Sequence, residues 1–299
     1  MTVTDRTPEG LAPRSAFTVK AQAAIIESDL QLVDLRTADD HQPEKKRRRR
    51  FPRGVERLLG VVVLLAVWQI AAWAGWISPK VLAGPVDVAS TFRDLVADGT
   101  LGSAVWASLQ RVAIGMAIGI PIGVLLALFA GLSRIGEDLT DSTMHMLRFV
   151  PIIALQPLII IWLGIGESAK ISLIVLGTIF PIYVNTANAI RTIDPKNLEL
   201  ARTLGLSRWE TIRRIVLPAA LPAFLVGLRM ATGIAWLLLV FAEQINAKSG
   251  IGYLMIKAQT FFQTDVIVVC LLVYAVLGVL SDFGVRSLEG RLLRWQPGR

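Results

Sequence analysis

Six stretches of about 20 predominantly apolar residues constrain this chain more than any other feature of its sequence. A helix needs about 20 such residues to cross the roughly 30 Å hydrocarbon core of a bilayer, because each residue adds about 1.5 Å. The pattern predicts an all-α integral membrane protein with about six transmembrane helices. The stretches cover Leu58–Ile77, Val112–Ala130, Phe149–Ile165, Ile171–Ile190, Ala219–Ala242 and Val266–Val285.

The composition excludes the ordinary soluble classes. Hydrophobic residues make up 54% of the 299 residues, charged residues only 18%, and the mean hydropathy is +0.57. Gly115, Gly119 and Gly123 are spaced by four, which lets membrane helices approach one another closely. The single cysteine, Cys270, lies in an apolar run and is expected to be a small buried hydrophobe.

The distribution of basic residues predicts the orientation. With the N-terminus in the cytoplasm and the count begun at Lys45, 20 Lys and Arg residues fall on the cytoplasmic side and 5 on the other. This is the positive-inside pattern, so both termini are expected in the cytoplasm, and the net charge of +8 needs no nucleic acid to explain it. In this topology Gly131–Arg148 and Arg191–Pro218 are cytoplasmic loops.

Residues 1–54 are expected to form a loosely ordered cytoplasmic extension, and residues 55–297 the transmembrane domain. The basic run Lys45–Arg50 lies next to the first span, where it fixes orientation and contacts anionic lipid. On the opposite side, Val86–Val96 has apolar residues at helical spacing, which predicts an interfacial or packed helix.

The loop at residues 191–218 has strong local signals for two helices. Asp194 and Pro195 are typical of a helix start, with Asp as the cap and Pro at the first position. Leu198, Ala201 and Leu204 follow at helical spacing, and Gly205 is suited to a left-handed helix end. Ser207 and Glu210 have the spacing of a capping box, and this second helix is expected to run to Leu217–Pro218. The loop is thus suited to bind another protein and to transmit its movement to the adjoining membrane helix.

These residues resemble the EAA motif of ATP-binding-cassette importer permeases. Glu199, Leu200 and Ala201, then Gly205, then Ile215-Val216-Leu217-Pro218 match its spacing, with Leu200 as the one departure from the usual Ala. The resemblance implies a type I importer fold. It also implies a coupling helix that inserts into the ATPase subunit, with Glu199, Ala201, Leu204, Gly205, Ile215, Leu217 and Pro218 as coupling residues.

Further segments resemble the permeases for nitrate, taurine, aliphatic sulfonates and bicarbonate, and aliphatic sulfonate permeases most of all. They are Phe180–Asp194, Gly227–Glu243, Ser249–Leu254, Gln263–Val269 and Leu293–Pro297. The resemblance implies a multi-pass protein of the bacterial cytoplasmic membrane and a substrate that is a small anion. The implied partners are a second permease copy, an ATPase dimer that binds ATP and Mg, and an external substrate-binding protein.

The candidate residues for a substrate pathway are Arg229, Arg111, Trp236, Glu243 and Asn246. Arg229 lies about ten residues into the fifth span, and a charge at that depth usually faces a cavity or a partner. It either attracts the anion or pairs with a carboxylate. Arg111 begins the second span, from which it can snorkel to the interface. Glu243 and Asn246 close the fifth span, where they either gate the outer mouth or cap the helix.

Several motifs are missing from the sequence. It has no phosphate-binding loop of the G-x-x-x-x-G-K-[ST] type, so ATP is expected on a partner, and we expect no catalytic residues, bound cofactor or metal. A secondary carrier would need internal repeats and acidic groups at the membrane midplane, and neither is found. An intramembrane enzyme is disfavoured because the catalytic motifs are missing. Taurine, nitrate and bicarbonate remain alternative substrates.

Overall fold

The computed structural model describes residues 53–245 and 247–295, and every regular element within these ranges is a helix. This confirms the predicted all-α class. The expected extension at residues 1–54, including Lys45–Arg50, lies outside the described residues apart from Arg53 and Gly54. The chain divides into residues 1–62 and 63–299, and the arrangement described below is that of the second unit. The elements are α2 (Arg53–Trp73), α3 (Pro85–Ala97), α4 (Thr100–Leu132), α5 (Arg134–Phe149), η1 (Ile152–Leu155), α6 (Gln156–Leu163), α7 (Glu167–Arg191), α8 (Pro195–Thr203), α9 (Arg208–Thr211), η2 (Ile212–Val216), α10 (Leu217–Gln244), α11 (Ile251–Thr260) and α12 (Thr264–Leu292).

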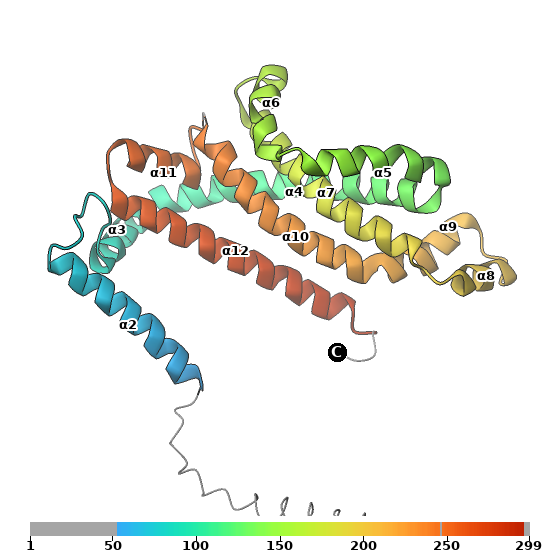
Figure 1. Cartoon of the computed structure of the whole chain (residues 1–299), viewed down its shortest axis with the longest axis horizontal. Helices are drawn as coiled ribbons and strands as arrows, with labels where there is room; N and C mark the ends of the chain where they lie inside the picture. The colour runs from blue at the N-terminus through green and yellow to red at the C-terminus, as the bar shows by residue number, and fades with distance from the viewer. Residues whose placement is uncertain (1–52, 246, 296–299) are drawn as a thin grey trace, which may run out of the picture. The chain divides into compact units, whose positions relative to one another are not determined.

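Four helices in the described residues are long and apolar enough to cross a membrane: α4, α7, the continuous helix Arg208–Gln244, and α12. They contain the predicted second, fourth, fifth and sixth spans. The predicted first span falls largely in α2, whose apolar part, Val62–Trp73, is shorter. In Figure 1, α4, α7, α10 and α12 lie side by side, and α8 and α9 stand at one end of this group. We call this the α8 end, and the opposite end the far end.

The prediction of one continuous span over Phe149–Ile165 is wrong. The segment is divided into the end of α5, the 3-10 turn η1 and the short helix α6. Pro151 explains the break, because it holds the preceding residue, Val150, in an extended conformation (φ −80°, ψ 118°). Pro157 then stands in the first turn of α6, where a proline is tolerated.

The prediction of a loop over Gly131–Arg148 is also wrong, because most of it is the 16-residue helix α5. The hydroxyl of Ser133 caps this helix by accepting a hydrogen bond from the Gly136 amide. Asp141 of α5 pairs with Arg191 of α7, at 2.6 Å between carboxylate and guanidinium. This partner is 50 residues away in the sequence, so local periodicity does not reveal why α5 packs here.

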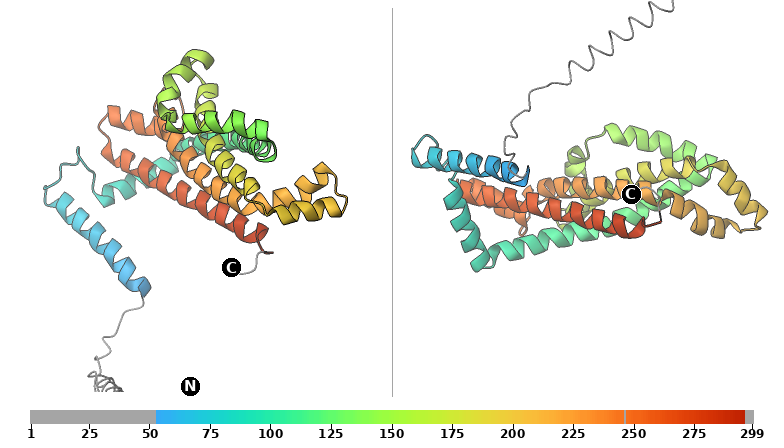
Figure 2. Two further views of the ribbon diagram at one scale, coloured as in Figure 1. Left: turned by 45° about the vertical axis from the view of Figure 1, so that its right-hand side comes forward. Right: turned by 90° about the horizontal axis from the view of Figure 1, so that it is seen from below.

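The glycine stripe of α4 packs directly on α7, as the four-residue spacing predicts. A Cβ added to Gly115, Gly119 or Gly123 would lie only 2.5 to 2.9 Å from Ile174, Thr178 and Ile182, respectively. Each partner stands 59 positions later than its glycine, so α4 and α7 are parallel and in constant register. Because the two helices are parallel, α5, η1 and α6 must return the chain from the α8 end to the far end. α5 contacts α4, and Figure 2 shows both helices in two further views.

α3 forms where a helix was expected, and Leu95 of its apolar stripe packs against the core, but most of the stripe does not. Val86, Phe92 and Val96 are exposed, whereas Val88 is buried. The buried face is fixed by a polar contact, because the Thr91 hydroxyl donates to the Asp265 carboxylate at the start of α12, at 2.6 Å. Cys270 is fully buried in α12, as predicted.

Candidate functional site

The first helix of the 191–218 loop begins and ends as its sequence predicts. The Asp194 carboxylate accepts a hydrogen bond from the Lys196 amide at 2.9 Å, and Pro195 is the first residue of α8. Gly205 has a left-handed φ of +68°, and the Leu206 amide donates to the Ala201 carbonyl at 3.0 Å. This 6→1 bond closes the end of the helix in the usual glycine-dependent way.

The second helix begins with the predicted capping box. The Ser207 hydroxyl accepts from the Glu210 amide at 3.3 Å, and the Glu210 carboxylate accepts from the Ser207 amide at 3.0 Å. Both of these hydrogen bonds are made within four residues of the chain. They therefore hold the turn between α8 and α9 without help from the rest of the protein.

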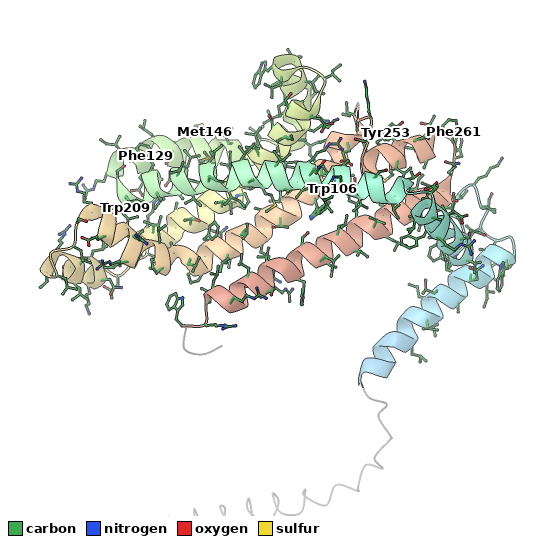
Figure 3. The ribbon with its side chains drawn as sticks, turned by 180° about the vertical axis from the view of Figure 1, so that it is seen from behind. Trp106, Phe129, Met146, Trp209, Tyr253 and Phe261 are labelled. Atoms are coloured by element: carbon green, nitrogen blue, oxygen red, sulfur yellow. The ribbon has the colours of Figure 1, made fainter. Side chains whose placement is uncertain are left out.

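The exposed side of this module is apolar. Leu200, Leu204 and Trp209 are 55%, 64% and 67% exposed, and Figure 3 shows Trp209 at the α8 end. Ala201 is buried, so the predicted single face of Leu198, Ala201 and Leu204 is wrong for Leu204, which lies just after the helix. Leu200, the departure from the motif, contributes to the exposed surface.

The helix does not end at Leu217–Pro218 but continues from Arg208 to Gln244 through the π-helical turn η2. Pro218 explains this turn. It has no amide hydrogen for the carbonyl four residues earlier, and its ring would clash with that carbonyl in a regular α-helix. The wider turn at Ile212–Val216 precedes Pro218 and includes the coupling candidate Ile215. The sequence reasoning missed this feature, although Pro218 was its signal.

At the far end, Arg111 is buried and uses every donor it has. A guanidinium has five N–H groups. Its Nε and Nη2 bind the Glu167 carboxylate at 2.5 and 2.8 Å, and Nη1 binds Glu243 at 2.6 Å. Nη1 and Nη2 also bind the Ser249 carbonyl and hydroxyl, at 2.8 and 2.9 Å. Arg111 is only 4% exposed, so it does not snorkel as expected.

Glu243 is a fully buried member of this network, with 0% of its side chain exposed. Its carboxylate accepts hydrogen bonds from the Ser108 hydroxyl, the Gly252 amide and the Tyr274 hydroxyl, besides Arg111. It therefore does more than cap α10, because it joins α4, α10, α11 and α12.

Two glycines let the chain pass this carboxylate. A Cβ on Gly250 would lie 2.4 Å from Glu243 and 2.6 Å from Arg111, and the φ of Gly250 is +112°. A Cβ on Gly252 would lie 2.6 Å from Glu243. These contacts explain the two glycines of the segment Ser249–Leu254.

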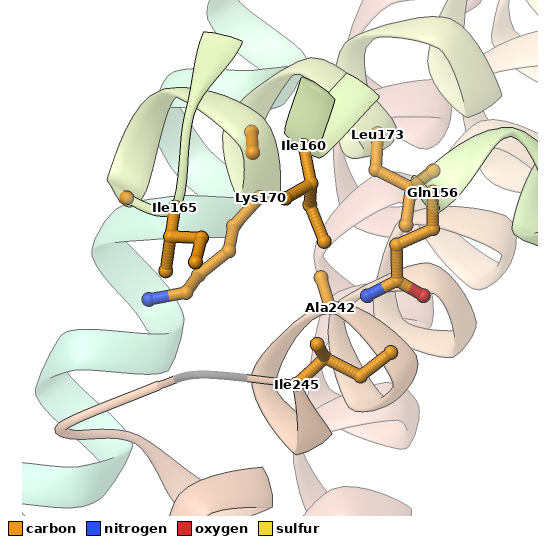
Figure 4. Close-up of a pocket in the computed structure, with 9 residues that line it drawn as sticks. Gln156, Ile160, Ile165, Lys170, Leu173, Ala242 and Ile245 are labelled. Carbon is orange, nitrogen blue, oxygen red and sulfur yellow. The ribbon is translucent and has the colours of Figure 1, made fainter. Parts of the chain in front are cut away.

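Glu167 connects the network to a second buried cation, Lys170. The Lys170 ammonium lies 2.9 Å from the Glu167 carboxylate and is 7% exposed, whereas the Glu167 side chain is 55% exposed. Figure 4 shows Lys170 beneath Ile165, with its nitrogen directed away from Gln156. The sequence analysis did not predict this pair, because both residues lie between two predicted spans, Phe149–Ile165 and Ile171–Ile190.

Arg229 pairs with a carboxylate, one of the two roles considered for it. Its Nε lies 2.5 Å from Asp282 on α12, which also binds Arg286 at 2.8 Å. Arg229 and Asp282 are 40% and 37% exposed, so the pair lies at a surface of this chain.

The remaining pathway candidates are Trp236 and Asn246. Trp236 is buried, donates to the Ser281 hydroxyl at 3.0 Å and meets Tyr274 edge-on, with ring centroids 6.5 Å apart. It thus joins α10 to α12. Asn246 lies outside the described residues.

Comparison with known proteins gives a family match over residues 119–294, to the binding-protein-dependent transport system inner membrane component. SsuC of Escherichia coli K12, named for aliphatic sulfonate transport, is 49% identical over 79% of this chain and 90% of its own length. SsuC of Bacillus subtilis 168, named likewise, is 41% identical over 80% and 87%. The taurine transport system permease TauC of Escherichia coli K12 is 33% identical over 85% and 95%.

Solved structures share the fold at low identity. A chain of the inward-facing MetNI methionine ABC transporter has a TM-score of 0.53 at 22% identity, covering 64% of this chain and 96% of that one. A chain of a bacterial alginate ABC transporter, solved with an alginate-bound periplasmic protein, has a TM-score of 0.58 at 17% identity, covering 80% and 94%.

Proposed function

The chain belongs to the family of inner membrane components of binding-protein-dependent transport systems, and on this premise we propose that it carries aliphatic sulfonates. Members of this family are the non-catalytic, membrane-spanning subunits of ABC importers. The main support for this substrate is the 49% identity to SsuC over 79% of the chain. Taurine, an aminosulfonate, is the second candidate, supported by the 33% identity to TauC.

The proposed ATPase contact is the exposed apolar surface of α8 and α9. Leu200, Leu204 and Trp209 are more than half exposed beside polar residues such as Glu199, which is typical of a surface that a partner covers. The caps at Gly205 and Ser207 keep this surface rigid. Ile215, Leu217 and Pro218 join it to the span α10 without a break, so a displacement of α8 moves α10 as well.

The proposed assembly has two copies of this chain, an ATPase dimer at the cytoplasmic α8 end and a substrate-binding protein at the far end. The exposed apolar surfaces of α4 and α12 are available for lipid and for the second copy. Nucleotide binding shifts the pore between two states only if the nucleotide-bound ATPase binds one of these states more tightly. The same difference in affinity couples ATP hydrolysis to substrate release.

Arg229 is the proposed pathway residue nearer to the α8 end. It is 40% exposed, and one carboxylate, Asp282, is shared between it and Arg286. Two arginines on one aspartate leave a net positive surface, which attracts an anion into the pore. Figure 1 shows α10 and α12, which carry these residues, side by side.

Growth on defined sulfur sources tests the proposal. A strain that lacks this permease and has no other sulfonate importer should grow on sulfate but not on ethanesulfonate, and should recover when the gene is returned. Normal growth of the deletion strain on every sulfonate would contradict the substrate. Loss of growth on taurine alone would favour the second candidate.

A further inference from the structure

The far-end network contains a carboxylate in a position that an anionic substrate could take. We propose that Arg111 and Lys170 form a seat for the sulfonate group of the substrate, and that Glu167 occupies this seat when no substrate is bound. This inference rests on the proposed function for the chemical class of the ligand.

The two carboxylates that bind Arg111 are held very differently. Glu243 has 0% of its side chain exposed and is fixed by Ser108, Gly252 and Tyr274 as well. Glu167 is 55% exposed, and within the described residues 53–245 and 247–295 its carboxylate accepts hydrogen bonds from Arg111 and Lys170. Glu167 can therefore rotate into solvent, where its charge is well hydrated. Glu243 cannot leave its site without being replaced by another anion.

Departure of Glu167 would leave a site with the right charge. Arg111 would still be neutralised by Glu243, and Lys170 would be a buried cation without its carboxylate. A buried unpaired charge is costly, so the open site favours an incoming anion. A sulfonate carries one negative charge, as Glu167 does, and the exchange leaves the net charge of the site unchanged.

The geometry of the bound Glu167 carboxylate shows how a sulfonate would be held. One oxygen is shared by Arg111 Nη2 and Lys170 Nζ at 2.8 and 2.9 Å, and the other meets Arg111 Nε. Such a two-pronged contact is the strong mode of oxyanion recognition by arginine. Two sulfonate oxygens can repeat these contacts, and the Ser249 hydroxyl beside Arg111 is within reach of the third.

The space next to the seat fits the rest of an aliphatic sulfonate. A hollow of about 380 Å³ adjoins Arg111 and Glu167, which is within the usual range for small-molecule sites. Ala107, Ile114 and Ile171 supply an apolar part of its lining beside the charged groups. An alkyl chain attached to the sulfonate can therefore lie on apolar side chains while the charged group meets the two cations.

The decisive variant is Glu167→Gln, which removes the competing charge and keeps the shape of the side chain. We expect the purified permease–ATPase complex in lipid nanodiscs to bind radiolabelled ethanesulfonate about tenfold more tightly, if Glu167 fills the seat about nine-tenths of the time. Equilibrium dialysis without binding protein measures this. Lys170→Gln should weaken binding, and Asp138→Asn, an exposed carboxylate on α5, should leave it unchanged.

If Glu167 has only a structural role, Glu167→Gln should not bind ethanesulfonate more tightly than the wild type, since losing an ion pair does not create affinity. If Glu167→Gln binds ethanesulfonate no more tightly than the wild-type complex, the proposed seat is refuted. This result stands even if Lys170→Gln fails to assemble. If cells import ethanesulfonate but this variant gains nothing, the seat is wrong and the proposed function stands. If cells import nitrate instead, and the variant binds nitrate more tightly, the seat stands and the proposed substrate is wrong.

Discussion

Replacing Arg111 by methionine should destabilise the protein by leaving Glu243 as a buried charge without its cation. Breaking a buried ion pair by removing one partner costs about 3–5 kcal/mol. Because Ser108, Gly252 and Tyr274 still donate to the Glu243 carboxylate, we expect the lower limit, about 3 kcal/mol. This corresponds to a change of about 150-fold in the folding equilibrium.

The double variant Arg111→Met with Glu243→Gln distinguishes the lost charge pair from lost packing. Glutamine keeps the shape of Glu243 and its acceptor for the Gly252 amide but carries no charge. The double variant should therefore recover about 2 kcal/mol relative to Arg111→Met alone. Equilibrium unfolding of the purified permease in mixed micelles, followed by tryptophan fluorescence, measures all four members of the cycle. A double variant no more stable than Arg111→Met would refute the reasoning.

Three further predictions concern packing, coupling and transport. Gly119→Leu should prevent assembly of the purified complex, because the added side chain meets Thr178 at 2.8 Å, whereas Gly233→Leu, which has open space, should assemble normally by size-exclusion chromatography. Gly205→Val should leave ATP hydrolysis active but uncouple it from uptake in proteoliposomes, since a β-branched residue disfavours the left-handed end of α8 by about 1–2 kcal/mol; coupled uptake at the wild-type rate would count against the coupling role. Arg229→Ala should abolish sulfonate uptake in vesicles while the complex still assembles, and normal uptake would exclude it from the pathway.

Sequence signals predicted the features that are made by neighbouring residues. The caps at Asp194, Gly205 and Ser207 each depend on a backbone group within a few positions, so they can be read directly. The glycine stripe of α4 was equally clear, because small residues at a spacing of four have one common use in membranes. Its partner helix, however, was not identified by the pattern.

Features that depend on distant partners were missed or misread. The segment of α5 was expected to be a cytoplasmic loop because it lies between two predicted spans, but it is a helix in which Asp141 pairs with Arg191 of α7. Arg111 was expected near the interface because it begins the second predicted span. Its burial could not be read locally, since the carboxylates that it binds stand 56 and 132 positions away in the sequence. A buried charge network is neutral only as a whole, so none of its members taken singly reveals the others.

The constant offset between α4 and α7 makes the two helices intolerant of changes in length. Deleting one residue in α4 after Gly115 would rotate all that follows by about 100° and turn Gly119 and Gly123 away from Thr178 and Ile182. The returning segment 133–166 has no such register to keep with α4 along its whole course, and it already contains breaks. Among related permeases, insertions and deletions should therefore concentrate between these two helices and avoid their interiors, so that the number of residues from Gly115 to Gly123 stays fixed while the distance to the next span varies.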